Sequence, residues 1–396
     1  MSSTSGARPL RPEPVAILAA GVATPIGLDL DAFWSGLLAG ADGLSAIERF
    51  PTADLRVGRG GEIKKLPPVA LGIRSRAAAL LVAAAADLGA RARLDAAPER
   101  IAVIVGTALG GVEELDHALT DDRRARRALD GLYDSPAHAL AAWLGARGPV
   151  LTVSSACASG ATSLGLGADL LREGIADLVV AGGFDILCRF VMRGFDVLRS
   201  LARDRVRPFD RRRTGLHLGE AAGLVLLARE PDARGPRLGR LLGHGSASDA
   251  SHVAAPDAEG RGLQAAIRAA LAAGDVDAAD LDFVSAHGTG TVLNDRIETA
   301  VLRRVLGNRA GVVPVNSIKG ALGHTMGAAA TLEAIMCLLA GRDGWIPPTV
   351  GFEEPDPACD LDYVAGTCRA VRPRRMLSTS LGFGGCNAAL VLEAGS

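Results

Sequence analysis

The sequence predicts an α/β protein built from two similar halves. Short apolar, strand-like runs alternate with helical patterns along the chain, which is the order expected of a sheet covered by helices. A weak internal repeat supports a duplication, because Val153-Ser-Ser-Ala-Cys157 and Val315-Asn-Ser-Ile-Lys319 each precede a helical pattern. The clearest strand-like runs are Ile101 to Val105, Leu178 to Ala181, Gly223 to Ala228, Phe283 to Ser285 and Ala388 to Leu392.

The boundary between the halves is placed by charge and proline content. Residues 1–14 are polar and contain prolines, so we expect a disordered lead-in and no signal peptide there. The charged, proline-containing stretch Arg229 to Arg240 separates the later strand-like runs. We therefore expect an N-terminal half over residues 15–243 and a C-terminal half over residues 244–396.

The composition is that of a large enzyme with an aliphatic core. The 396 residues are 48% hydrophobic but only 4% aromatic, and the net charge of −1 argues against general nucleic-acid binding. No apolar run reaches the roughly 18 to 20 residues that a membrane-spanning helix needs, and Ala77 to Ala86 is predicted to be an interior helix. The six cysteines form no CxxC pair, so we expect a cytoplasmic chain without disulfides and without a metal site.

Cys157 is the most informative single residue. It lies in Val153-Ser-Ser-Ala-Cys-Ala-Ser-Gly160, where an apolar run gives way to small residues and then to a helical pattern. Free N–H groups and the positive end of a helix dipole at such a junction favour the thiolate, so a nucleophilic cysteine is expected. The segment alone also permits a second interpretation, in which Cys157 is a buried thiol packed like a small hydrophobe.

Two histidine motifs favour the nucleophile. His287, in Ala286-His-Gly-Thr-Gly-Thr291, follows one strand-like run, and His324, in Ser317-Ile-Lys-Gly-Ala-Leu-Gly-His-Thr-Met-Gly327, follows another. Histidines in glycine- and threonine-rich loops at strand ends are more typical of a site than of a core. Lys319 is one of only three lysines among 43 basic residues, which suggests a position that needs a compact ammonium, although chance remains an alternative.

With Leu381-Gly-Phe-Gly-Gly-Cys-Asn387, these motifs give the chain a resemblance to a known family. It resembles the β-ketoacyl-acyl-carrier-protein synthases, the type I/II branch of condensing enzymes in the thiolase superfamily, nearly from end to end. The Cys-His-His pattern disfavours the type III branch and the degradative thiolases. The resemblance implies a thiolase fold, in which two duplicated α/β halves form a five-layered αβαβα sandwich with the active site between them.

The resemblance also implies a decarboxylative Claisen condensation and a role for each site residue. Cys157 would carry the acyl group, and His287 and His324 would act as neutral donors to the enolate of the malonyl group. The N–H groups of Cys157 and Phe383 would form the oxyanion hole. Lys319 would orient His324, with Glu333 as its partner or as a buried structural residue. The supporting residues would be Thr289 and Thr291, which hold the pantetheine, and Gly382, Gly384 and Gly385, which let Phe383 act as a gate.

The partners implied are an acyl-carrier protein and a second ketosynthase chain, either a copy of this one or a chain-length-factor-like homologue. No cofactor is implied, because the substrates travel on the phosphopantetheine of the carrier protein. Nucleic acid and membrane insertion are not expected. An acidic carrier would dock on arginines, and the candidates, each of which could instead be ordinary solvated charge, are Arg123, Arg124, Arg126, Arg127, Arg203, Arg205 and Arg207.

Departures from the family pattern leave the pathway open. Leu218-Gly-Glu-Ala-Ala-Gly223 replaces the family's Met-Gly-Glu-Gly-Ala-Gly, and Cys386 replaces a threonine; we expect both to be packing changes. The departure that bears on the substrate is Gly110 to Leu144, which is shorter than the corresponding region of ordinary elongation synthases. These features leave fatty-acid synthesis and specialised polyene, aryl-polyene or polyketide pathways as alternatives. The chain could also be a non-catalytic chain-length-factor-like subunit, although its cysteine, histidines and lysine argue against that. A metal-dependent hydrolase is a weaker rival, because metal-ligand spacing is lacking.

Overall fold

A single mixed sheet runs through both halves of the chain. The computed structural model describes residues 13–67, 73–120, 128–233 and 235–395, and in this part of the chain an 11-stranded sheet has the order β12-β10-β9-β14-β15-β8-β1-β7-β6-β4-β5. Its strands are β1 (Val15–Ala23), β4 (Ile101–Gly106), β5 (Val150–Val153), β6 (Leu178–Asp185), β7 (Ala221–Arg229), β8 (Gly239–Ser248), β9 (Phe283–Ser285), β10 (Pro314–Asn316), β12 (Asp362–Tyr363), β14 (Arg375–Gly382) and β15 (Cys386–Ala394). Two small ribbons pair β2 (Ser45–Ala46) with β3 (Arg59–Gly60) and β11 (Trp345–Ile346) with β13 (Arg369–Ala370).

The two halves of the sheet meet at β1 and β8. These strands pair antiparallel for a short stretch, with Val15 opposite Leu241. On the N-terminal side β5, β4 and β6 run parallel, and on the C-terminal side β14, β9 and β10 do so. The carboxyl ends of these parallel strands carry the loops in which the sequence places its motifs.

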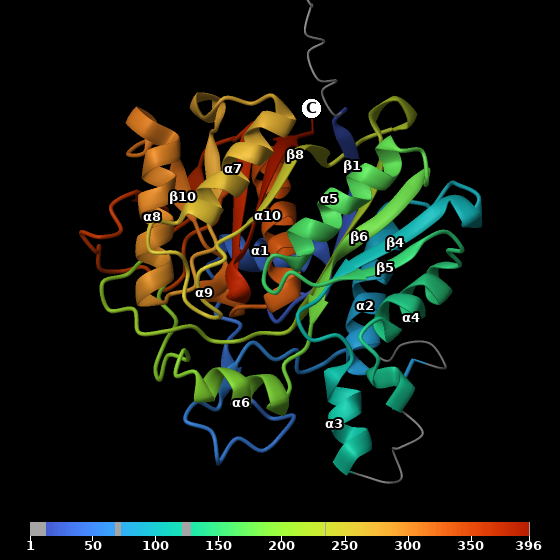
Figure 1. Ribbon diagram of the computed structural model, residues 1–396, viewed down its shortest axis with the longest axis horizontal. Coiled ribbons are helices and arrows are strands. Elements are labelled where there is room, and N and C mark those ends of the chain that lie inside the picture. Colours follow the sequence, from blue (N-terminus) through green and yellow to red (C-terminus); the bar gives the residue numbers. More distant parts are fainter. Residues whose placement is uncertain (1–12, 68–72, 121–127, 234, 396) are drawn as a thin grey trace, which may run out of the picture.

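Helices separate the molecule into layers (Figure 1). The helices are α1 (Leu30–Leu38), α2 (Arg76–Arg91), α3 (Val112–Thr120), α4 (Ser135–Leu144), α5 (Ser159–Arg172), α6 (Arg189–Val197), α7 (Arg261–Gly274), α8 (Val292–Leu306), α9 (Lys319–Leu322) and α10 (Ala329–Asp343). Helices α2 and α4 cover the outer face of the N-terminal strands, and α7, with α8 beside it, covers the outer face of the C-terminal strands. Helices α5 and α10 lie between the two sets of strands and contact both. The expected five-layered arrangement is therefore confirmed.

Helix α10 of the central layer is buried along most of its length. In α10 every side chain from Ala329 to Gly341 is buried, which fits a helix enclosed by sheet on both faces. The halves approach one another closely here, because a Cβ on Gly183 of β6 would lie 2.1 Å from the Gly327 carbonyl oxygen. Only glycine permits this contact, and it brings the ends of β6 and of the segment before α10 together.

The strands and the interior helix expected from the sequence are all present, and Ala77 to Ala86 lies inside α2. The division after residue 243 stays a prediction. That position lies inside β8, which runs unbroken from Gly239 to Ser248. Most of the expected lead-in, residues 1–12, lies outside the described residues. Within the described chain, no helix combines the length and the hydropathy that crossing a membrane requires.

Candidate active site

Cys157 lies in a tight turn between β5 and α5, as the sequence predicts. The turn is closed by main-chain bonds, because the N–H groups of Ala158 and Ser159 donate to the carbonyl oxygens of Ser155 and Ala156 at 3.1 Å. Ala156 adopts a left-handed φ of 51°, a conformation that few side chains larger than glycine adopt without cost. This backbone places the thiol at the wall of a cavity, with Cys157 7% exposed.

His287 follows β9, and two carboxylates of α8 hold its loop. Glu298 accepts hydrogen bonds from the N–H groups of His287 at 2.7 Å and Gly288 at 2.8 Å. Asp295, one turn earlier, accepts from the N–H of Gly290 at 3.2 Å. Sequence reasoning did not assign a role to either acid. The available signal was a pair of acids three residues apart at the start of a helix that follows a glycine-rich loop.

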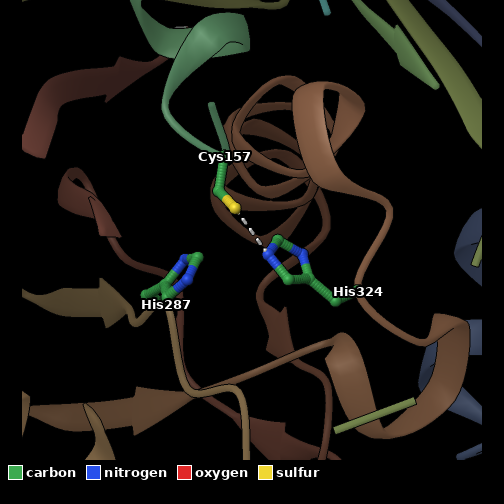
Figure 2. Close-up of side chains that lie close together, drawn as sticks. All are labelled: Cys157, His287 and His324. Atoms are coloured by element: carbon green, nitrogen blue, oxygen red, sulfur yellow. Dashed lines mark hydrogen bonds between the residues drawn. The ribbon is translucent and has the colours of Figure 1, made fainter. Parts of the chain in front are cut away.

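His324 lies between α9 and α10, and its ring reaches the thiol. Its Nε2 is 2.9 Å from Cys157 Sγ (Figure 2). Its Nδ1 accepts the N–H of Met326 at 3.3 Å. Because Nδ1 is an acceptor, the proton of the neutral ring is assigned to Nε2, which then donates toward the sulfur.

The sulfur and the two rings converge on one point (Figure 2). The Cys157 sulfur and one ring nitrogen each from His287 and His324 lie within 4.8 Å of one another. The two imidazole rings stand edge to face, with centroids 5.1 Å apart. A sulfur and two nitrogens are donors that zinc accepts. However, a metal needs the lone pair of His324 Nε2, and the bond from Met326 places a proton there. The local hydrogen bonding thus suits a proton donor better than a metal ligand.

Lys319 and Glu333 form a buried ion pair beside this cluster, with both side chains at most 2% exposed. The Lys319 ammonium also donates to the His287 carbonyl oxygen at 2.6 Å. Lys319 was expected to orient His324, with Glu333 as its partner. The pairing with Glu333 is present, and the second hydrogen bond of the ammonium goes to the main chain of His287 in the loop after β9. A role of Lys319 in orienting His324 stays a prediction.

The electrostatics make both histidines neutral. Burial, together with the nearby Lys319 ammonium, holds the pKa values of His287 and His324 well below the ordinary range. Neutral rings can act as hydrogen-bond donors at physiological pH without losing a charge. This agrees with the expectation for the two histidines.

The protonation state of Cys157 differs from the expectation. Burial raises the pKa of its thiol to about 12, and the opposing effects of the Lys319 charge and the Phe383 N–H do not offset it. The prediction of a thiolate at neutral pH was therefore wrong, because the buried surroundings of Cys157 favour the protonated thiol. Position at a strand-to-helix junction indicates where a nucleophile can be, but burial, which depends on the whole fold, decides its resting charge.

Phe383 lies over the nucleophile. Its main-chain N–H favours the ionised form of Cys157, so it is directed at the sulfur as an oxyanion-hole donor would be. Its ring stacks on Phe195 of α6 with centroids 5.5 Å apart. Gly384 has a φ of 78° and no neighbour within 4 Å of an added Cβ, which leaves the loop room to change conformation.

A cavity of about 420 Å³ connects the site with the surface. Cys157, His287 and His324 line its inner end. Thr289 and Thr291 line it as well, with their hydroxyl oxygens 3.0 Å apart. A narrow cavity with a pair of hydroxyls on its wall suits a flexible chain that carries amide groups.

The expected docking arginines are only partly described. Arg123, Arg124, Arg126 and Arg127 lie outside the described residues. Arg205 pairs with Glu353 at 3.1 Å and Arg207 with Asp204 at 2.6 Å, while Arg203 is exposed. Arg199, which sequence reasoning did not select, is exposed and lines the cavity.

Comparisons with known proteins match this geometry. The family described as "Beta-ketoacyl synthase, N-terminal domain" matches residues 12–233, and "Beta-ketoacyl synthase, C-terminal domain" matches residues 238–353. The chain is 38% identical to the tetracenomycin polyketide synthase ketoacyl synthase alpha subunit of Streptomyces glaucescens, over 96% of each chain. It is 32% identical to 3-oxoacyl-[acyl-carrier-protein] synthase 2 of Synechocystis, over 96% of this chain and 97% of the relative.

A solved structure shares the whole fold. The structure titled "The ishigamide ketosynthase/chain length factor" superposes with a TM-score of 0.89 at 33% identity, covering 97% of this chain and 99% of that chain. The expected thiolase-type fold is thereby confirmed. The chain belongs to the β-ketoacyl synthase family, whose members are acyltransferases that catalyse condensation.

Proposed function

We propose that this protein condenses an acyl group held on Cys157 with malonyl-acyl-carrier protein, releasing carbon dioxide and giving 3-ketoacyl-acyl-carrier protein. The observation that carries the proposal is the convergence of one thiol and two neutral imidazoles at the inner end of a cavity. A thiol can hold an acyl group, and two neutral donors can stabilise an enolate.

In the loading step the Cys157 sulfur attacks the carbonyl of an acyl thioester. The bond to the pantetheine sulfur breaks, and the proton of Cys157 ends on the departing thiol. Because the resting thiol is protonated, its S–H bond must break as the sulfur attacks, and negative charge forms on the sulfur for a short time before it passes to the carbonyl oxygen. The Nε2–H of His324, 2.9 Å from Sγ, is placed to stabilise that charge.

In the second step the malonyl thioester loses carbon dioxide. The electron pair of the broken carbon–carbon bond passes to the thioester oxygen, which becomes an enolate oxygen. His287 and His324 would donate to this oxygen. Because their lowered pKa values keep both rings neutral, each ring carries one N–H group that it can donate to the enolate oxygen.

In the third step the enolate carbon attacks the acyl-cysteine carbonyl. The charge moves to that carbonyl oxygen, where the N–H groups of Cys157 and Phe383 would stabilise it. Removal of one such donor typically costs about 3 to 4 kcal/mol of transition-state stabilisation. Collapse expels the Cys157 sulfur, which takes up a proton from water, and the 3-ketoacyl product leaves on pantetheine.

The carrier arm would enter along the cavity wall that holds Thr289 and Thr291, with the exposed Arg199 and Arg203 near an acidic carrier surface. Relatives named for polyketide synthesis and for 3-oxoacyl synthesis both match, so the pathway is either specialised metabolism or fatty-acid synthesis. The second chain would be a copy of this one or a chain-length-factor-like homologue, as in the ishigamide structure's title.

A second candidate function is that of a non-catalytic chain-length-factor-like subunit. The likeness to the ishigamide ketosynthase/chain length factor structure supports considering this role. The intact cluster of Cys157, His287 and His324 favours the catalytic role. A shaping subunit has no need of a thiol and two neutral histidines in contact.

Separate measurement of the half-reactions distinguishes the two functions. We expect wild-type protein to form an acyl adduct on Cys157, detected by peptide mass spectrometry, and to release labelled carbon dioxide from malonyl-acyl-carrier protein. Cys157→Ala should abolish the adduct but keep part of the decarboxylation, because both histidines remain. Cys368→Ala, a half-buried cysteine outside the cavity, is the matched control and should retain both. Wild-type protein without either half-reaction would contradict the catalytic proposal.

A further inference from the structure

Asp185, at the end of β6, is a buried acid to which the proposed chemistry gives no role. Its side chain is 0% exposed, and it forms no ion pair with a described lysine, arginine or histidine. One carboxylate oxygen accepts the Thr107 hydroxyl at 2.7 Å and the Leu109 N–H at 3.0 Å. The other accepts the Ala108 N–H at 2.8 Å and the Gly327 N–H at 2.7 Å.

These four hydrogen-bond donors show which protonation state of Asp185 the site stabilises. A carboxylate offers about four lone-pair positions, and a protonated acid loses one of them to its own O–H. All four partners here donate, so a proton on Asp185 would face a donor and not an acceptor. The cradle therefore fits the ionised carboxylate, although burial opposes the charge.

The donors come from both halves of the molecule. Thr107, Ala108 and Leu109 follow β4 in the N-terminal half, whereas Gly327 precedes α10 in the C-terminal half. Gly327 directly follows Met326, whose left-handed φ is 50° and whose N–H donates to His324 Nδ1. Asp185 thus holds the segment that sets the tautomer of His324.

We propose that Asp185 is a positioning residue for His324: its carboxylate anchors Gly327, and thereby aims the Met326 N–H that keeps the proton of His324 on the nitrogen facing Cys157. This role rests on the proposed function, because it matters through the donation of His324 to the enolate. When the anchor is lost, the turn at Met326 relaxes and the ring loses its fixed tautomer. Misplacement of a catalytic group by about 1 Å can reduce the rate about 100-fold.

The positioning role of Asp185 should depend on pH, because only the ionised carboxylate fits its four hydrogen-bond donors. Burial raises the pKa of Asp185 to about 6, so the acid is ionised above that pH and protonated below it. The segments that donate to it carry no charged side chain, and the titratable groups that sense its charge are Cys157 and Tyr133. Neither of these titrates near pH 6, since the pKa of each is raised above an already alkaline ordinary value.

The test is malonyl decarboxylation by the purified full-length protein across pH. In wild-type protein kcat should fall about tenfold between about pH 7.5 and about pH 5, as Asp185 takes up a proton. Asp185→Asn should lower kcat at the upper pH by about 10- to 100-fold, leave KM nearly unchanged and remove this acid limb. Asp87→Asn is the matched control, because Asp87 is also buried and accepts two main-chain N–H groups, but these belong to Val22 and Leu30 and not to the segment that holds His324. It should lower thermal stability and keep both the rate and the limb.

A second pair of variants keeps the proposal testable if Asp185→Asn fails to fold. Thr107→Val removes one donor to the ionised carboxylate, so the pKa of Asp185 should rise and the limb should move to higher pH. Thr107→Ser keeps the hydroxyl and should leave the limb in place. An unmoved limb in Thr107→Val, or a persistent limb in a folded Asp185→Asn, would overturn the positioning role while wild-type decarboxylation still supports the proposed function. Wild-type protein without decarboxylation at any pH would refute both.

Discussion

The nucleophile and the two histidines are held in place in different ways. Cys157 lies in a turn closed by main-chain bonds among small residues, with a left-handed Ala156 before it. The loop of His287 is instead fixed by the buried Glu298 and Lys319. The nucleophile depends on backbone geometry, whereas the His287 segment depends on buried charge.

This difference separates reactivity from protonation. The turn of Cys157 contains no acidic side chain, so burial is the main cause that keeps its thiol protonated. Attack by the sulfur therefore depends on hydrogen-bond donors that stabilise the charge formed during the reaction. The histidines are neutral because they are buried, and the nearby Lys319 ammonium lowers their pKa values further. Changes in the charged network should therefore affect stability and decarboxylation first, and changes around the turn should affect loading first.

Removal of one partner from the buried ion pair should have the largest effect. Lys319→Met leaves the Glu333 carboxylate without its cation, and such a loss typically costs about 3 to 5 kcal/mol of unfolding free energy. Urea denaturation would measure this cost. The double variant Lys319→Met/Glu333→Leu should recover part of it, because no uncompensated charge stays buried. The same lysine change at the exposed Lys65 should cost no more than about 1 kcal/mol. Equal costs at the two lysines would remove the distinction between the two regions.

Replacing either histidine with alanine should slow decarboxylation much more than acylation of Cys157. His287→Ala and His324→Ala each remove one donor to the enolate, so decarboxylation should fall by about 10²- to 10³-fold. Acylation of Cys157 should remain in part, since the enolate forms only after loading. Labelled carbon dioxide release and adduct mass report the two steps separately. An equal loss of both steps in a folded variant would show that the nucleophile and the histidines act as one unit.

The alkylation rate of Cys157 tests the resting charge of the nucleophile. With a pKa of about 12, the thiolate fraction grows with pH, so alkylation by iodoacetamide should rise about tenfold per pH unit from about pH 7 to about pH 9. Peptide mass spectrometry would follow Cys157 alone, in a Cys368→Ala background that silences one half-buried thiol outside the cavity. An alkylation rate that levels off within that range would show that Cys157 is already a thiolate, as the sequence predicts.

Charge reversal at Arg203, an exposed residue four positions after the cavity-lining Arg199, should have the smallest effect. Arg203→Glu should raise KM for the acyl-carrier protein several-fold at low salt, and the effect should shrink as salt screens the contact. A short pantetheine thioester has no acidic surface and should be unaffected. Arg268→Glu, an exposed residue of α7 that does not line the cavity, is the control. If both substrates suffer alike, Arg203 supports the local structure and not docking.

The fold and the positions of the motifs were readable from local signals. Apolar runs followed by glycine, serine and threonine marked the strand ends that carry Cys157, His287 and His324, and these positions are local properties of the chain. The rarity of lysine drew attention to Lys319, which the structure places in the buried network.

The missed features depend on contacts between distant segments. Asp185 meets donors 78 and 142 residues away along the chain, so nothing near it in the sequence reveals its role. The bond from Lys319 to the main chain of His287 and the raised pKa of the Cys157 thiol were missed for the same reason. Each is decided by what the folded chain packs around the group, and neither helix-end position nor composition contains that information.

The enclosed central layer also has a consequence for synthesis. Helices α5 and α10 each contact strands of both halves, and α10 is made long after α5. While the ribosome completes the chain, the N-terminal half must wait with the inner face of its strands and one side of α5 uncovered. We expect a fragment of residues 1–243 to expose this apolar surface and to aggregate when expressed alone. We therefore expect the two halves to fold as one cooperative unit.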